Sequence, residues 1–394
     1  MREAQRRDAG RGAASAAGEL AVGRLVALPV VLSAAFSIAF LMVVVPAAAR
    51  AQDTTDHAAH HVYELGAFTV ESGATIPQAK LVYATYGHLD AHRDNAILLP
   101  SHYMADHHGY DWLIGPALAL DTTRYFLIAT EMFGNGHSSS PSNTPEPFHG
   151  PRFPVTTIRD NVEAVHRLLT HELGITHLRA IIGFSMGAEQ AFQWAVSYPS
   201  FMDRIVATSG TAKCYGHGYV RLEGQIAALE ADGDFKGGDY TEEPARGIRA
   251  FGAVWAGWLY SQEWWRRELW RTLMPQAKSA EDAMAAVVKG FEGADANNYI
   301  LQARTWERHD VGATKGFDGN VERALRSITV PVLYMPSATD LYFPLGDAEY
   351  ERQFIAHVQF LPIPSLWGHP AGAGEAPADR AFLNTHIRDF LGQH

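Results

Sequence analysis

Short apolar runs recur along the chain between turn residues, and their spacing predicts a buried sheet. Continuous apolar runs of this length are typical of central strands. They occupy Asn95 to Pro100, Arg124 to Thr130, Leu178 to Phe184, Arg204 to Thr208, Val330 to Met335 and Val358 to Pro362. Helical spacing marks Thr156 to Leu173 and a closing segment, Arg380 to Leu391. Strands that alternate with helices predict an α/β fold with a mostly parallel sheet.

Two earlier segments show a different pattern. Val62 to Val70 alternates loosely, Ala79 to Tyr86 alternates apolar and polar residues, and Gly73-Ala74 between them is a turn signal. Alternation of this kind is typical of strands with one solvated face. We therefore expect an antiparallel hairpin at one edge of the sheet.

The run that ends at Phe184 leads into Gly183-Phe184-Ser185-Met186-Gly187, and helical spacing begins at once. Strand, sharp turn and helix form the context of a nucleophile elbow. Small residues are needed there because side chains would clash with the neighbouring strand and helix. The pattern predicts that Ser185 is an activated nucleophile at a helix N-terminus, which favours negative charge developing in acyl transfer. The plainer interpretation is a Gly/Ser-rich turn that matches by chance.

A serine nucleophile needs a base, and the base needs a carboxylate that orients it. With an elbow serine the acid follows a late strand and the histidine follows the last one. Asp340 comes just after the Val330 to Met335 run, and His369 just after the Val358 to Pro362 run. Each stands at the carboxyl end of a strand, where open α/β sheets place their sites. Asp347 is the rival acid; its place at the start of a predicted helix suits a capping role.

An oxyanion hole for this serine would combine two backbone amides. One is the amide of Met186, directly after the nucleophile. The other comes from the loop Ser101 to Met104, which follows the first central strand, and we favour the amide of Tyr103. His102 is an alternative polar wall of the pocket.

The pattern changes between Thr211 and Asn320. Strand runs vanish, the spacing becomes helical, and tryptophans are dense, among them Trp255, Trp258, Trp264 and Trp265. We expect a helical cap insertion over 211–320, with the core formed by 62–210 and 321–394. Most of these tryptophans should pack the cap's own core, and at least one should face Ser185 and line an apolar substrate pocket.

The N-terminus is predicted to lie outside this fold. Arginines precede an uncharged apolar run from Leu25 to Val45, and Ala49-Arg50-Ala51 follows as a small-residue cleavage site. This pattern is typical of a secretory signal peptide, so we expect residues 1–51 to be a signal peptide, cleaved after Ala51, and 52–61 to be a polar linker. The run is also long enough for an uncleaved membrane anchor. We expect the protein to be periplasmic or secreted.

Charge and cysteine content exclude several classes of function. The formal net charge of the 394 residues is −11, which argues against a nucleic-acid partner. A single cysteine, Cys214, permits neither an intrachain disulfide nor a CxxC motif. The His-rich segments 59–61 and 102–108 show no ligand spacing on a helix or strand, so we predict no metal and no cofactor. For the polar, His-rich residues 52–61, metal binding is the alternative to a linker. The sequence leaves the oligomeric state open, a homodimer included.

Several ordered blocks make the chain resemble the homoserine O-acetyltransferase-like branch of the α/β-hydrolases, from about Val62 to the C-terminus. The blocks are Trp112 to Gly115, Leu120 to Phe126, Gly134-Asn135-Gly136 with Ser142-Asn143, Asp160-Asn161-Val162, Gly183 to Gly187, Asp340 to Pro344, and Gly368-His369. The resemblance implies an α/β-hydrolase fold, a Ser-Asp-His acyl-enzyme mechanism and a helical lid.

The chain departs from that family's pattern near the nucleophile. Phe184 and Ala188 stand where the acetyltransferases usually have glycine, and Pro370 follows the histidine where they usually have an acidic residue. The acyl-CoA donor of that family is cytoplasmic, whereas this chain is predicted to be exported. We therefore expect an exported hydrolase of small-molecule esters. An O-acyltransferase of the homoserine type is the alternative, and a non-catalytic binding protein on the same scaffold is a remote one.

Overall fold

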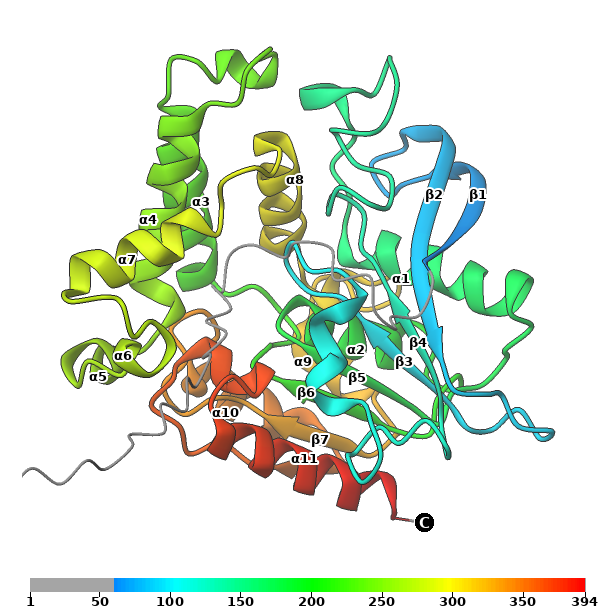
Figure 1. Cartoon of the computed structure of the whole chain (residues 1–394). Coiled ribbons are helices and arrows are strands. Elements are labelled where there is room, and N and C mark those ends of the chain that lie inside the picture. Colours follow the sequence, from blue (N-terminus) through cyan, green and yellow to red (C-terminus); the bar gives the residue numbers. More distant parts are fainter. Residues whose placement is uncertain (1–59, 394) are drawn as a thin grey trace, which may run out of the picture. The chain divides into compact units, whose positions relative to one another are not determined.

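The computed structural model describes residues 60–393, which build one twisted sheet flanked by helices (Figure 1). The strand order is β1-β2-β4-β3-β5-β6-β7-β8. β1 and β2 pair antiparallel, β2 pairs antiparallel with β4, and the remaining pairs are parallel. The strands are β1 (His61–Thr69), β2 (Thr75–Tyr86), β3 (Ala96–Pro100), β4 (Phe126–Thr130), β5 (Ala180–Phe184), β6 (Ile205–Thr208), β7 (Val332–Met335) and β8 (Val358–Phe360). The predicted α/β sheet and its edge hairpin are confirmed.

The α-helices follow the strands in the predicted alternation, with one long interruption. They are α1 (Ile158–Arg167), α2 (Met186–Ser197), α3 (Gly216–Glu230), α4 (Ala245–Leu259), α5 (Gln262–Arg266), α6 (Trp270–Leu273), α7 (Ala280–Lys289), α8 (Ala296–Glu307), α9 (Val321–Arg326), α10 (Leu345–Glu351) and α11 (Pro377–Leu391). The closing helix begins at Pro377, three residues before its predicted start, because proline suits the first turn of a helix.

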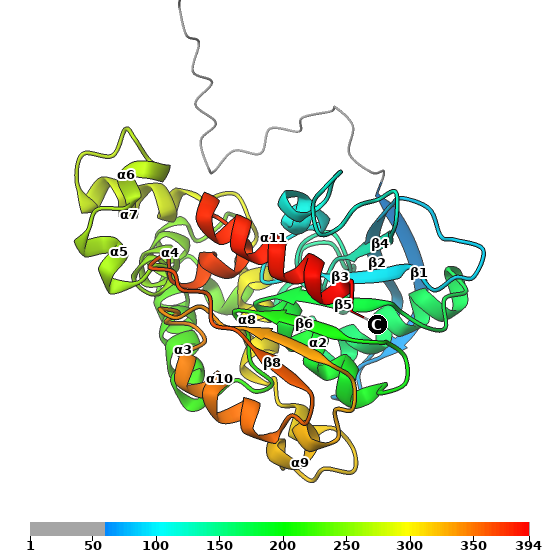
Figure 2. The same ribbon diagram turned by 90° about the horizontal axis from the view of Figure 1, so that it is seen from below.

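The apolar runs are continuous because the central strands are covered on both faces. All five residues of β3 and of β5 are buried. Leu98 and Ile181 belong to the core shared with α1 and α2, whereas Ile97 and Ile182 belong to the core shared with α11. Figure 2 shows α11 lying across its own face of the sheet. The parallel strands therefore bring their carboxyl ends to one edge between these two helical layers.

Helices α3 to α9 all lie between β6 and β7 in the chain. Residues 211–320, all of which the structure describes, contain α3 to α8 and no strand of the sheet. In Figure 1, α3, α4 and α7 lie together on the side away from the hairpin β1–β2. Part of this segment has its own core, in which Tyr260, Trp264 and Trp270 are buried. The helical character expected of the insertion is therefore present.

The predicted signal peptide and nearly all of the predicted linker lie outside the described residues. β1 begins at His61, one residue before the predicted start of the core. Within residues 60–393, no helix has the length and the apolar composition needed to cross a membrane.

Candidate active site

Ser185 stands between β5 and α2 in a backbone conformation that is rare for a residue with a side chain. Its φ is 56° and its ψ is −126°. The two flanking glycines explain how the turn is accommodated: a Cβ at Gly183 would collide with the carbonyl of Gly187, and a Cβ at Gly187 would lie 2.5 Å from the carbonyl oxygen of Pro100. The serine is 2 % exposed. The turn thus holds the Ser185 hydroxyl at the N-terminus of α2, as the sequence predicted.

The fold brings the three predicted side chains into one row. The Nε2 atom of His369 lies 2.9 Å from the Oγ of Ser185, and the Nδ1 atom lies 2.8 Å from Oδ2 of Asp340. All three residues are buried. With Nδ1–H donating to the carboxylate, Nε2 carries the lone pair that faces the serine hydroxyl. This arrangement has the geometry of a nucleophile, a base and an orienting acid.

The loops that carry Asp340 and His369 hold each other in place. The second carboxylate oxygen of Asp340 accepts hydrogen bonds from the amides of Tyr342 (2.8 Å) and Phe343 (3.1 Å). Thr339 accepts a hydrogen bond from the amide of Gly368, directly before the histidine. Gly368 has φ 68°, where a side chain would be strained. The orientation of the acid and of the base is therefore fixed by hydrogen bonds.

The loop after β3 lies beside the elbow helix. The side-chain amide of Gln190, in α2, donates to the carbonyl of Ser101 at 2.8 Å. Tyr103 is buried, its hydroxyl donates to the carbonyl of Tyr299 at 2.7 Å, and its ring stacks on Trp255. Met186 is the first residue of α2. The ring of His102 lies 4.8 Å from the ring of Phe184. Sequence reasoning missed Gln190, whose only signal is its place one turn into the elbow helix.

Tyr110 is a second residue that sequence reasoning missed. Its hydroxyl donates to the carbonyl of Pro100 at 2.6 Å and accepts from the amide of Phe184 at 3.1 Å. The tyrosine thus joins the carboxyl ends of β3 and β5, the two strands that carry the loop and the nucleophile. No spacing rule relates Tyr110 to either strand, so the sequence holds no signal for this role.

Asp347, the rival acid, and three other histidines of the C-terminal part of the chain, His357, His386 and His394, were the remaining candidates. Asp347 lies in the first turn of α10, where Pro344 is the capping residue, so the predicted capping role for this aspartate is wrong. The backbone of His357 pairs with Val332 at the start of β7, and the ring of His386 packs on Phe382 in α11. His394 lies outside the described residues. None of these three described side chains makes a hydrogen bond to Ser185 or His369 within residues 60–393.

Aromatic rings surround the histidine. Phe184, Tyr342 and Phe343 lie with their ring centroids 4.8, 4.8 and 5.5 Å from that of His369. Arg221, from α3, places its guanidinium over the ring of Tyr342 at 4.1 Å. Burial lowers the pKa of this arginine. Aromatic rings therefore enclose the buried base and limit its contact with solvent.

Two carboxyl groups outside the row of Ser185, His369 and Asp340 are buried, those of Glu189 and Glu351. Glu189, one turn into α2, is fully buried, and burial raises its pKa well above the usual range. Burial also raises the pKa of Glu351 to about 8, although this side chain accepts hydrogen bonds from the amide of Ala212 and from the hydroxyls of Tyr215 and Tyr334. Glu351 therefore favours its neutral form near pH 7, and burial shifts Glu189 toward its neutral form.

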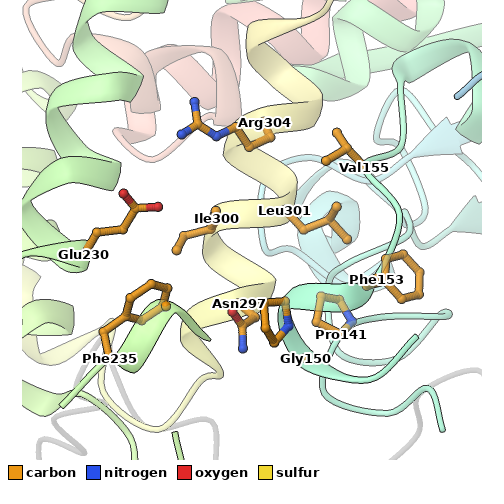
Figure 3. Close-up of a pocket in the computed structure, with 12 residues that line it drawn as sticks. Pro141, Gly150, Phe153, Val155, Glu230, Phe235, Asn297, Ile300, Leu301 and Arg304 are labelled. Carbon is orange, nitrogen blue, oxygen red and sulfur yellow. The ribbon is translucent and has the colours of Figure 1, made fainter. Parts of the chain in front are cut away.

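A pocket of about 430 Å³ opens between α8 and the loop 141–155 (Figure 3). Ile300, Leu301 and Phe153 give it apolar walls, and Glu230 and Arg304 add charge on the side of α3 and α8. Its lining contains no member of the row Ser185, His369, Asp340. This pocket is therefore distinct from the candidate catalytic site. His60, His107 and His108 form a group of side chains that could ligate a metal ion, and the group contains no member of that row.

Comparison with known proteins gives matches along most of the chain. The family model described as alpha/beta hydrolase fold matches residues 98–372. An ethyl acetate hydrolase of Pseudomonas veronii is 33% identical over 85% of this chain and 96% of its own length. A homoserine O-acetyltransferase of Corynebacterium diphtheriae is 30% identical over 78% of this chain and 88% of its own. The solved structure of an acetylester hydrolase from Corynebacterium glutamicum superposes with a TM-score of 0.82 and 31% identity, covering 85% of this chain and 96% of that one.

Proposed function

Since this chain belongs to the α/β hydrolase fold family, we propose that it is an exported ester hydrolase whose nucleophile is Ser185. The chain is similar to ester hydrolases and to homoserine O-acetyltransferases, which share acyl transfer as their chemistry. The observation that carries the proposal is the row of two hydrogen bonds from Asp340 through His369 to Ser185.

In the proposed mechanism, Nε2 of His369 takes the proton of Ser185 as Oγ attacks the ester carbonyl. The backbone amides of Met186 and Tyr103 donate to the developing oxyanion. Asp340 stabilises the imidazolium and keeps Nε2 directed at the serine. His369 then returns the proton to the departing alcohol. Water, activated by the same histidine, attacks the acyl group on Ser185 and releases the acid.

Two observations favour water over an alcohol as the final acceptor. Phe184 fills space beside the base with an aromatic ring at a position where the acetyltransferase pattern has glycine. Pro370 follows His369, so the acidic residue expected of an acetyltransferase is missing there. The names of two relatives, an ethyl acetate hydrolase and an acetylester hydrolase, point to short-chain acetyl esters as the substrate class.

The second candidate is an O-acyltransferase, favoured by the similarity to homoserine O-acetyltransferases. The two functions share the acyl-Ser185 intermediate and differ in the group that attacks it. The experiment supplies p-nitrophenyl esters of rising chain length, and separately acetyl-CoA with homoserine, to the purified protein. We expect fastest hydrolysis of the acetate and no O-acetylhomoserine. Formation of O-acetylhomoserine faster than ester hydrolysis would establish the acyltransferase instead.

Export is proposed from the sequence of residues 1–51, with cleavage after Ala51. The purified native protein should begin at Gln52 and be recovered outside the cytoplasm. N-terminal sequencing that finds residues 25–45 retained would favour the membrane-anchored form.

A further inference from the structure

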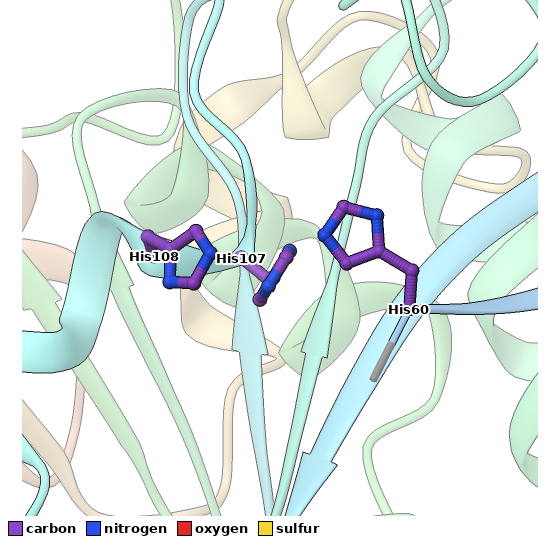
Figure 4. A group of neighbouring side chains, drawn as sticks. All are labelled: His60, His107 and His108. Carbon is purple, nitrogen blue, oxygen red and sulfur yellow. The ribbon is translucent and has the colours of Figure 1, made fainter. Parts of the chain in front are cut away.

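Three histidines from two distant parts of the sequence meet at one place, where His60 is exposed and His107 is buried. His60 precedes β1, whereas His107 and His108 open the short 3-10 helix η1 (His107–Leu113) after β3. One ring nitrogen from each lies within 4.8 Å of the other two. Figure 4 shows the His107 ring between the rings of His60 and His108. The ring centroid of His107 lies 4.2 Å from that of His60 and 3.9 Å from that of His108.

The surroundings of His107 are those typical of a histidine that binds a metal ion. Its Nδ1 lies 2.8 Å from the carboxylate of Glu131, and both side chains are fully buried. Asn135 holds the other carboxylate oxygen of Glu131 at 2.8 Å. Such a carboxylate fixes the tautomer of a ligating imidazole and raises its basicity. The Nε2 of His107 is buried and has no hydrogen-bond partner among the described residues.

An orphaned buried nitrogen is costly unless something occupies its lone pair. The acceptor nitrogen of His107 faces a cluster whose other members are also imidazoles. His108 repeats the carboxylate contact, because its Nδ1 lies 2.8 Å from Oδ2 of Asp111. With Nδ1–H donating, the acceptor nitrogen of His108 is Nε2. His60 is exposed, and its ring lies edge-on to the ring of His107.

We propose that His60, His107 and His108 bind a divalent transition-metal ion of the zinc class. Imidazole nitrogens suit this class, and three histidines leave a fourth position for water, or for His137, whose ring lies 6.1 Å from that of His60. Zinc–nitrogen bonds are about 2.0–2.1 Å long, so small side-chain rotations bring the three nitrogens into range. The ion ties the start of β1 to η1, the helix that also carries Tyr110.

Zinc titration of the metal-stripped, untagged full chain tests the site. We expect saturable binding of one Zn²⁺ per chain, with nitrogen ligands in the X-ray absorption spectrum of the zinc. His60→Ala removes an exposed ligand without disturbing the core and should weaken binding at least about tenfold, as should His108→Ala. His61→Ala is the matched control, because the ring of His61 packs on Tyr83 outside the cluster. The zinc affinity of this variant should equal that of the wild type.

Three outcomes would overturn the proposal. The first is the absence of saturable zinc binding to the wild-type chain. The second is an unchanged affinity in both His60→Ala and His108→Ala. The third is an equal loss of affinity in His61→Ala, which would indicate adventitious capture by the histidine-rich stretch rather than by the three-histidine cluster.

Discussion

The ring of Tyr103 stacks on the ring of Trp255 with centroids 4.8 Å apart and planes 29° apart. Tyr103 belongs to the loop after β3, and Trp255 belongs to α4 in the predicted cap. Trp255 also lies 5.1 Å from Tyr342, whose ring contacts His369 at 4.8 Å. Trp255 therefore links the helical insertion to both sides of the candidate active site.

Replacing Trp255 should change substrate selection. Trp255→Ala removes the ring next to Tyr103 and opens space near the acyl site, so kcat/KM for long esters should rise relative to that for acetate. The matched variant is Trp264→Ala, because Trp264 is fully buried and stacks on Tyr260 in a separate core. Trp264→Ala should lower the free energy of unfolding by about 3–5 kcal/mol. The ratio of kcat/KM for long esters to that for acetate should stay unchanged. Equal kcat/KM ratios in both variants and the wild type contradict the pocket role of Trp255.

Removing the Tyr110 hydroxyl should damage the site without touching the triad. Tyr110→Phe leaves the carbonyl of Pro100 and the amide of Phe184 without their shared partner. Each buried group left unsatisfied costs about 1–3 kcal/mol, so the melting temperature and kcat should both fall. Tyr219→Phe, at a half-exposed position of α3, should change neither. A Tyr110→Phe protein with wild-type melting and kcat would refute the bridging role.

The buried Glu351 should make the protein less stable as the pH rises. Burial raises its pKa to about 8 from an ordinary 4.5, so the folded protein keeps a proton that the unfolded chain loses. The folded state binds more protons between these values, so the free energy of unfolding falls from about pH 4.5 to about pH 8. Glu375, with its pKa raised by burial to about 7, acts in the same direction.

Urea unfolding across this pH range measures the effect. Glu351→Gln should reduce the slope without abolishing it, because Glu375 remains. Glu349→Gln, at an exposed position of the same helix, should keep the wild-type slope. An identical slope in the Glu351→Gln protein would mean that this carboxyl carries no proton in the folded state.

Asp340, rather than Asp347, should be the acid that orients the base. Asp340→Asn keeps the shape but loses the charge that holds the His369 tautomer, so kcat should fall by about 10⁴-fold with little change in stability. Asp347→Asn, in the first turn of α10, should stay within a few-fold of wild type. The reverse ranking of the two variants would reassign the acid.

The sequence predicted the sheet well because its strands are buried on both faces. Continuous apolar runs marked β3 and β5, and the order of Ser185, Asp340 and His369 at strand ends predicted which side chains would meet. These features are local, or follow from the rule that parallel strands present their carboxyl ends at one edge.

Features that depend on tertiary contacts could not be predicted from the sequence. Tyr110 acts through two backbone groups, on β3 and β5, that no spacing relates to it. The histidine-rich stretches showed no ligand spacing because His60 meets His107 and His108 only after β1 folds against η1. Likewise, dense tryptophans marked the insertion, but only the structure separates Trp255, near the triad, from Trp264, in its own core.

Covalent labelling tests the central claim most directly, because a fluorophosphonate reacts only with an activated serine. The wild-type protein should gain one adduct, mapped by peptide mass spectrometry to Ser185, and should lose its esterase activity in step. Ser337→Ala, which removes another buried serine hydroxyl, should label like the wild type. Ser185→Ala should neither label nor hydrolyse p-nitrophenyl acetate, with kcat reduced by about 10⁶-fold. An adduct at another residue, or substantial turnover by a folded Ser185→Ala protein, would contradict the account.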